Sequence, residues 1–417
     1  MSISHEQGPT PGPAAPGATL SNVKSQLKTL WQGDTGLVPV LLGLLVLVIY
    51  FQIRSSVFLS AGNLTNLFTQ ATIFVLLGMA EVWLLLLGDI DLSLGYVMGL
   101  SAAIATILVD NQFHLSWILA MLVAVGVSTF IGFLHGTIVI RLRLPSFIVT
   151  LAGLLVWEGV MIWTIDSNGS GGTIALNEKV MYDLVSGQLT VLVTWVFVLV
   201  LVAFMGYSMV RTYQKRLASG LDVKPFYFII VKVVVLAIAG IVMVLVFNAN
   251  RGSFTVIRGM PFAVPIDFAV LGGGSFLLTK TRPGRYLYAI GGNSEGARRA
   301  GVNVNRYRLM AFMLAGFTAG IAGLLYASRL GGISDGVDGG NLVLLAVASA
   351  VIGGCSLYGG RGRMIHAVIG GVVIATVYNG MALVGIATSA QYIVTGLVLL
   401  AAVSVDSLAR RGNTMLR

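Results

Sequence analysis

The stretch FYFIIVKVVVLAIAGIVMVLVF, residues 226–247, carries a single charge, Lys232. A helix needs about 20 consecutive apolar residues to cross a lipid bilayer, and this stretch supplies them. It lacks the alternation of apolar and polar residues that marks a membrane-spanning strand, so its backbone must be hydrogen-bonded within a helix. Lys232 can extend its ammonium group to the nearer membrane surface, and we assign it no transport role.

Other parts of the chain repeat this pattern. Of the 417 residues, 56% are hydrophobic and 10% are charged, and the mean hydropathy is +0.90, whereas a soluble chain has about 25% charged residues. The sequence therefore predicts an all-α, polytopic transmembrane helical bundle of about 12 spans, with about 10 to 12 compatible with the pattern. The candidate spans are 37–53, 64–88, 92–109, 115–140, 145–165, 190–210, 226–247, 264–279, 309–326, 341–359, 364–386 and 389–405. The boundaries are least defined around 64–109 and 264–279.

Basic residues indicate how the bundle is oriented. If the N-terminus is cytoplasmic, twenty Lys and Arg residues fall on inner segments and five on outer ones, as the positive-inside rule requires. We therefore expect both termini to be cytoplasmic. Residues 1–36, rich in proline, are predicted to be a disordered cytoplasmic tail, 37–405 the membrane domain and 406–417 a short cytoplasmic tail.

The net charge of +10 is explained by this orientation, and we expect no nucleic-acid partner. The single cysteine, Cys355, rules out an internal disulfide and a thiolate metal cluster. We expect no metal and no cofactor on this chain, and we interpret Cys355 as a small buried residue.

The inner loop at 280–308 is the most patterned polar segment, with seven basic residues and one acid. In GGNSEGARRAG, residues 291–301, the paired glycines predict a tight turn. Asn293 or the following serine can cap a helix that has Glu295 in its first turn, and Gly301 can end it. So short a helix is marginal in water, so we expect it to pack on the bundle or on a cytoplasmic partner. A plain anchoring loop is the alternative.

Four stretches, in order, resemble monosaccharide permeases of ATP-binding-cassette importers of the ribose and xylose type. They are GDIDLSLG (88–95), LPSFIVTLAGLL (144–155), YAIGGNSEGARRAGVNV (288–304) and VIGGCSLYGG (351–360). The extra hydrophobic pair at 190–247 resembles the xylose permeases most.

The resemblance implies a multi-pass permease in a bacterial inner membrane. It also implies three partners besides the lipid bilayer, namely a second copy of the permease, a separate ATP-binding-cassette ATPase and an extracytoplasmic sugar-binding protein. The loop at 280–308 is then similar to the cytoplasmic coupling loop on which the ATPase docks. The coupling residues implied are Gly292, Asn293, Glu295, Gly296, Ala297, Arg298, Arg299 and Gly301. Because the sequence contains no GxxxxGK[ST] motif, ATP must bind on the partner.

The sequence departs from the family pattern after the fourth stretch. Arg361, Arg363 and His366 stand where a small, uncharged segment is expected, and residues 341–350 lack acidic side chains. These departures leave the local geometry and the substrate near 340–366 open.

Asp89, Asp91 and Ser93 in GDIDLSLG are candidate pathway residues. Carboxylates are costly in lipid, so the two acids must lie at the aqueous boundary or face a polar cavity. One interpretation is a discontinuous element that lines the sugar path. The other is a turn at the membrane surface in which Asp91 or Ser93 caps the next helix.

Two more acids lie within apolar runs. Glu81 lies near Trp83, and Glu158 follows Trp157. A carboxylate beside an indole suits a sugar, which has polar edges and an apolar face. For Glu158 and Trp157, anchoring at the membrane interface is the alternative.

The remaining pathway candidates are uncharged. Ser146 and Thr150 lie four residues apart on one helical face, where they can line the path or bond back to their own helix. Asn379, Gln391 and Tyr392 can also line the path, and hydrogen bonding between helices is their other role.

The sequence contains no HExxH or GxSxG motif, and we expect a transport subunit rather than an enzyme. The alternative is a proton-coupled secondary sugar transporter in which Glu81, Asp91 or Glu158 carries protons. A proton symporter has no need of a loop shaped to dock on an ATPase, so the loop favours the importer. The identity of the monosaccharide and the import direction rest on the resemblance alone.

Overall fold

The structure is a computed structural model. It describes residues 37–397 apart from 110–112, 114, 222, 224 and 253, together with residue 400. The tails expected at 1–36 and 406–417, and most of 398–405 in the last predicted span, lie outside the described residues.

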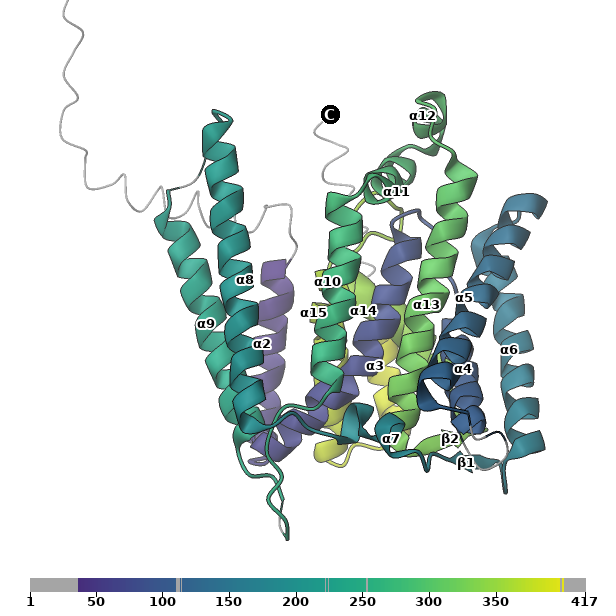
Figure 1. Cartoon of the computed structure of the whole chain (residues 1–417), viewed down its shortest axis with the longest axis horizontal. Coiled ribbons are helices and arrows are strands. Elements are labelled where there is room, and N and C mark those ends of the chain that lie inside the picture. The colour runs from purple at the N-terminus through teal and green to yellow at the C-terminus, as the bar shows by residue number, and fades with distance from the viewer. Residues whose placement is uncertain are drawn as a thin grey trace, which may run out of the picture.

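Helices make up nearly all of the described secondary structure (Figure 1). They are α2 (Leu37–Arg54), α3 (Ala61–Leu85), α4 (Leu94–Val109), α5 (Trp117–Leu142), α6 (Ser146–Asn168), α7 (Lys179–Ser186), α8 (Val191–Ala218), α9 (Tyr227–Asn248), α10 (Ala263–Lys280), α11 (Arg282–Gly292), α12 (Ser294–Arg299), α13 (Val304–Leu330), α14 (Gly339–Ile352) and α15 (Met364–Leu383). Residues 388–397 are also helical. Two short strands, β1 (Thr173–Ala175) and β2 (Gly332–Ser334), pair antiparallel. The sequence predicted no strands, and this ribbon follows α6 and α13, outside the spans.

The all-helical membrane bundle is confirmed. Among the described residues, eight helices are long and apolar enough to cross a bilayer. Three predicted spans correspond to shorter apolar helices, α2, α4 and α14. The expected number of about 12 spans therefore depends on how these three helices and residues 389–405 are counted.

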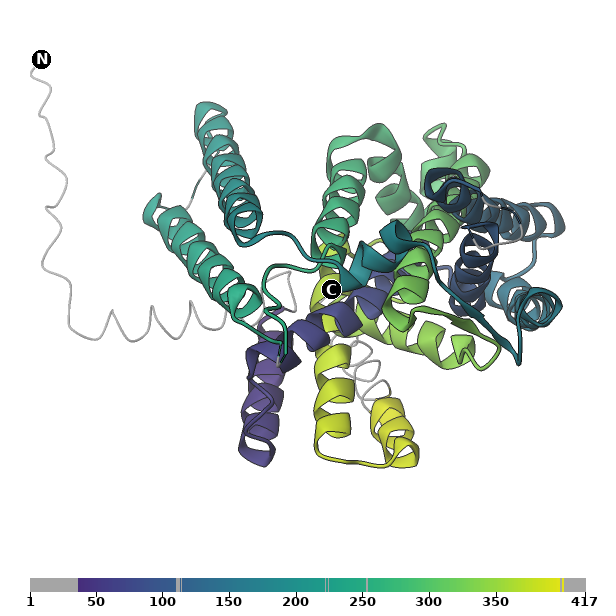
Figure 2. The same ribbon diagram turned by 60° about the horizontal axis from the view of Figure 1, so that its bottom comes forward.

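Burial separates the central helices from the peripheral ones. In the most apolar window of α3, 89% of the residues are buried, against 17% in α8 and 11% in α9. Helices α4, α13, α14 and α15 pack with α3 in the main core. Figure 2 shows α8 and α9 set apart from the other helices, so this pair presents most of its surface to lipid.

Glycines allow two very close helix contacts. In GFTAG (316–320) of α13, a Cβ at Gly316 would lie 2.2 Å from the carbonyl oxygen of Ser128 in α5. A Cβ at Gly95, near the start of α4, would lie 1.9 Å from the carbonyl oxygen of Gly339, at the start of α14. The two short helices therefore touch backbone to backbone where they begin.

The two ends of the bundle differ. Helices α11 and α12 lie at one end, at the top of Figure 1, and α7 with the β1–β2 ribbon lies at the other. The last turns of α5 and α8, which contain Arg141, Lys215 and Arg216, reach the α12 end. The basic inner segments predicted from the sequence thus share one end with α12.

Candidate functional site

The segment GDIDLSLG breaks the chain between α3 and α4. Helix α3 ends at Leu85, Gly88 has a φ of +77°, and α4 begins at Leu94. Asp89 is 6% exposed and accepts two hydrogen bonds from Arg308, one from Nε at 2.7 Å and one from Nη2. Such a bidentate pair fixes orientation as well as distance. Asp89 thus connects the break to the first turns of α13.

A buried polar chain starts from the same break. Asp91 Oδ1 accepts from the Ser93 hydroxyl at 2.6 Å, and Asp91 Oδ2 lies 3.3 Å from His135 Nδ1. On the far side of the ring, the Trp157 indole donates to His135 Nε2 at 2.9 Å. Because Nε2 accepts, a neutral imidazole carries its proton on Nδ1 and donates it to Asp91. These hydrogen bonds therefore hold the break, residues 88–93, against α5 and α6.

His135 was not a candidate from the sequence. It is 4% exposed and lies 44 residues from Asp91, so no local motif connects the two. The sequence feature that could have identified His135 is the presence of a polar, ionisable residue inside an apolar run. A Cβ at Gly153 would lie 2.6 Å from His135 Nε2, which shows that glycine at this position makes room for the imidazole.

Ser146 and Thr150 support the backbone of the break. Ser146 Oγ accepts from the Ile90 amide at 3.3 Å, and Thr150 Oγ1 accepts from the Leu92 amide at 3.1 Å. Thr150 Oγ1 also lies 3.0 Å from the carbonyl oxygen of Ser146, its own helix partner. Both side chains therefore stabilise the backbone of the break by accepting hydrogen bonds from its amides.

Neither Asp91 nor Ser93 caps α4 with its side chain. Asp91 Oδ1 accepts the amide of Ser93 at 2.9 Å, which closes a local turn, and the Ser93 carbonyl begins the helix by accepting from Tyr96 and Val97. Asp91 and Ser93 are 1% and 0% exposed. The break is thus buried in the protein rather than placed at an open surface.

Glu81 is the most isolated of the candidate acids. It is 0% exposed, and neither carboxylate oxygen has a hydrogen-bond partner among the described residues. It lies within electrostatic reach of Asp91, while its neighbour Trp83 donates to Thr318 at 3.3 Å. The structure therefore places Glu81 beside the break, but not in the hydrogen-bonded chain.

Trp157 and Glu158 have different partners despite being adjacent. Trp157 contacts His135, whereas Glu158 Oε1 accepts from the Tyr96 hydroxyl at 2.8 Å. The Tyr96 ring in turn lies against Gly339 at the start of α14. Glu158 therefore stabilises the place where the two short helices meet.

The remaining candidates lie away from the break. Asn379 Oδ1 accepts from Asn63 Nδ2 at 2.9 Å and links α15 to α3. Tyr392 donates to Asp338, the residue that caps α14, at 3.0 Å. Gln391 Nε2 donates to the Ile386 carbonyl at 2.8 Å. The structure thus separates these three residues from the cluster formed by Asp91, Ser93, His135 and Trp157.

The patterned loop forms two helices instead of one. Gly291 and Gly292 end α11 rather than forming a tight turn, because residues 282–292 are helical, an element that the sequence analysis did not predict. The signal was present, since Thr281 caps α11 and a proline follows in its first turn. Helix α12 then begins after Asn293, whose Oδ1 accepts from the Gly296 amide at 2.8 Å, as expected.

Helix α12 is a short helix, called the stub below, with exposed charged side chains and one buried residue. Glu295 lies 3.7 Å from Arg298 and 3.2 Å from Arg299, and all three side chains are more than half exposed. Ala297 is buried, and Gly301, with a φ of +83°, follows the helix. The exposed charges can contact another molecule, while α12 itself packs against α11 and α13.

Two of the four quoted stretches, 288–304 and 351–360, meet the end of α3 at this end of the bundle. A Cβ at Gly291, at the end of α11, would lie 1.7 Å from the Leu86 carbonyl oxygen, which also accepts from the Gly360 amide at 2.9 Å. Tyr288 donates to the Gly362 carbonyl at 2.7 Å. The end of α3, the patterned loop and VIGGCSLYGG are therefore joined through backbone contacts.

The departures from the family pattern are accommodated at the same end. Arg361 and Arg363 are exposed, while His366 is 7% exposed. His366 Nδ1 lies 3.7 Å from the sulfur of Cys355, which is buried as expected. The two arginines add positive charge to the surface without disturbing the core.

A comparison with known families identifies the chain. The sequence profile of a family described as "Branched-chain amino acid transport system / permease component" matches residues 63–403. The chain belongs to this permease family. It is therefore a multi-pass transport subunit of a bacterial inner membrane and not an enzyme.

Curated relatives cover most of this permease. It is 36% identical to the xylose transport system permease protein XylH of Escherichia coli K12 over 85% of this chain and 87% of the relative. It is 33% identical to XylH of Haemophilus influenzae over 88% and 95% of the two chains. It is 28% identical to the ribose import permease protein RbsC of Escherichia coli K12, over 88% and 92%. No solved structure matches this chain.

Proposed function

We propose that this chain is the permease of an ATP-driven monosaccharide importer, with xylose as the substrate. The 36% identity to a xylose permease supports the substrate. The observation that carries the mechanism is the connection between the exposed stub α12 and the break at 88–93, through the ion pair of Arg308 with Asp89.

The proposed assembly contains two copies of this chain, a separate ATPase and an extracytoplasmic sugar-binding protein. The α12 end faces the cytoplasm, both termini are cytoplasmic, and the chain crosses the membrane about 12 times if the short helices are counted. The clustering of basic residues at the α12 end supports this orientation. No cofactor is held by this chain, since ATP binds to the partner.

The ATPase is proposed to grip α12 through Glu295, Arg298 and Arg299. Eight residues, 300–307, separate Arg299 in α12 from Arg308 in α13, which is short enough for a displacement of α12 to reach α13 directly. Arg308 then moves Asp89, and the break shifts against α5 and α6. A two-state element of this kind transmits motion because packed contacts are discrete rather than continuously deformable.

We place the sugar path beside the two short helices. Asp89, Asp91, Ser93, Ser146 and Thr150 shape the break. Glu81, Trp157, Glu158, Asn379, Gln391 and Tyr392 are the further pathway residues. Tyr392 borders a cleft of ≈ 160 Å³ that also includes Asn341 and Thr395, and these hydroxyl and amide groups suit a sugar hydroxyl.

Reconstitution tests this function. The permease is placed in proteoliposomes with its ATPase and binding protein, and xylose uptake is measured with ATP supplied on the α12 side. Uptake should require ATP, the ATPase and the loaded binding protein. Xylose uptake by the permease alone, driven by a proton gradient, would instead establish the proton-coupled transporter, for which the isolated Glu81 would be the first residue to examine.

A further inference from the structure

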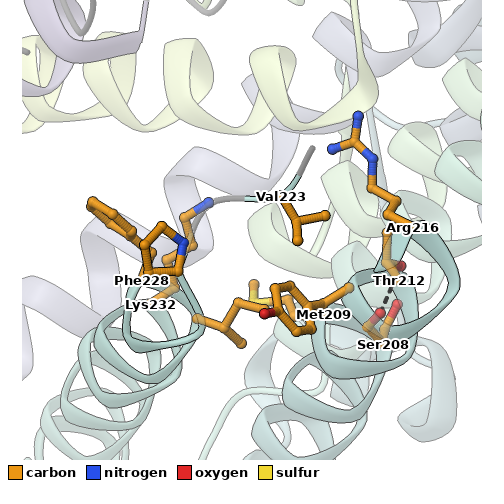
Figure 3. Close-up of a pocket in the computed structure, with 10 residues that line it drawn as sticks. Ser208, Met209, Thr212, Arg216, Val223, Phe228 and Lys232 are labelled. Carbon is orange, nitrogen blue, oxygen red and sulfur yellow. Dashed lines mark hydrogen bonds between the residues drawn. The ribbon is translucent and has the colours of Figure 1, made fainter. Parts of the chain in front are cut away.

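A cleft opens between α8 and α9, the two helices set apart from the bundle. Its volume is ≈ 840 Å³, within the range of about 300–1,000 Å³ that is typical of ligand pockets. It lies between the last part of α8 and the first part of α9 (Figure 3). Neither the break nor α12 contributes to it, so the transport mechanism does not use it.

Two cations line this cleft from opposite helices. Arg216 comes from the last turn of α8, and Lys232 lies six positions into α9. None of the described residues that line the cleft is acidic, and no ion pair in the described part of the chain includes either cation. Two basic side chains on the two sides of one cleft present a site complementary to a phosphate.

The remaining surface of the cleft is suited to an acyl chain. Met209, Val223, Phe228 and Ile229 line it beside the cations. Below the cleft, α9 presents exposed apolar side chains such as Val235. A free phosphate ion would use the cations and leave this apolar lining in contact with water, whereas a phospholipid would cover both.

We propose that the cleft between α8 and α9 binds an anionic phospholipid, with its phosphate between Arg216 and Lys232 and one acyl chain along the apolar face of α9. This occupant also accounts for Lys232. A cation within a lipid-facing helix is costly when it is unpaired, and a lipid phosphate supplies its counter-charge at the depth where the side chain ends. The site does not depend on the transported substrate.

Native mass spectrometry of the full chain in detergent tests the proposal. The protein is titrated with phosphatidylglycerol, phosphatidylcholine or inorganic phosphate, and bound adducts are counted. Wild type should bind phosphatidylglycerol roughly tenfold more tightly than phosphatidylcholine. The double variant Arg216→Gln with Lys232→Gln should lose this preference.

The matched control also removes two positive charges, both from the last part of α8. Arg211→Gln with Lys215→Gln changes two exposed residues that do not line the cleft, and it should keep the preference. Equal loss in both double variants, or in neither, would refute a specific site. Displacement of phosphatidylglycerol by equimolar inorganic phosphate would assign the site to phosphate ions and overturn the lipid. If the Gln variant does not fold, Arg216→Lys with Lys232→Arg, which retains both charges, should still prefer phosphatidylglycerol, and loss of the preference there would contradict the proposal.

Discussion

Asp89 and Arg308 are separated by 219 residues and form a bidentate ion pair that joins the break before α4 to the start of α13. The Asp89 side chain is 8% exposed and that of Arg308 is 30% exposed. The Asp89 carboxylate is thus shielded from water. Removing its partner Arg308 would leave that buried charge unpaired, which is costly. This ion pair is the contact through which a displacement of α12 would reach the break.

Replacing one member of this pair should destabilise the fold. Asp89→Asn should lower the free energy of unfolding by on the order of 3 kcal/mol, because Arg308 keeps a partly buried charge without its partner. The double variant Asp89→Asn with Arg308→Gln should cost less than the two single variants combined. Thermal unfolding in detergent measures both. Glu295→Gln is the control, since its exposed pair contributes less than about 1 kcal/mol; an equal loss there would contradict the shielding.

The space around His135 can be tested on α6. Gly153→Ala would place a methyl group 2.6 Å from His135 Nε2, so the ring must shift and lose the Trp157 hydrogen bond. We expect a loss of about 1–3 kcal/mol in stability. Gly159→Ala on the same helix has nothing within 4 Å of the new methyl group, and because alanine favours a helix more than glycine does, it should not lower the unfolding midpoint. Equal midpoints for the two variants would mean that His135 is not held as described.

The proposed coupling role of α12 predicts a separation of stability from transport. Glu295→Gln with Arg298→Gln changes only exposed side chains, so the unfolding midpoint should stay within the range of wild type. Xylose uptake in the reconstituted assembly should fall about tenfold or more, because the ATPase loses its contact. Arg306→Gln, exposed at the start of α13, should retain uptake. Normal uptake and ATPase association in the double variant would refute docking on α12.

The single thiol should be unreactive in the folded protein. Burial raises the pKa of Cys355 to about 12, so at pH 7 to 8 almost none of it is the reactive thiolate. A maleimide should label it only after denaturation, whereas Arg298→Cys on α12 should be labelled in the native protein. Labelling of native Cys355 at neutral pH would show that the loop at 353–363 opens.

The features of the fold that depend on a local sequence pattern could be predicted from the sequence. Continuous apolar runs predicted the helices, and Asn293 was recognised as a cap because capping involves residues three positions apart. Helix α11 was missed because its sequence, RPGRYLYAIGG, is short and not continuously apolar, so only Thr281 and the proline in its first turn indicated the start of a helix.

The connections that define the candidate site had no such pattern. Asp91 meets His135 and Asp89 meets Arg308 only after α4, α5 and α13 have packed. Each of these residues alone fits a surface charge or an ordinary buried group. Their pairing depends on how the helices pack against one another. A single sequence does not specify that packing.

The backbone contact of Gly95 with Gly339 limits how this permease can move. Two helix starts that interlock with no side chain between them have no smooth surface along which to slide. The starts of α4 and α14 therefore cannot slide past each other, and in the proposed transport cycle they must move together.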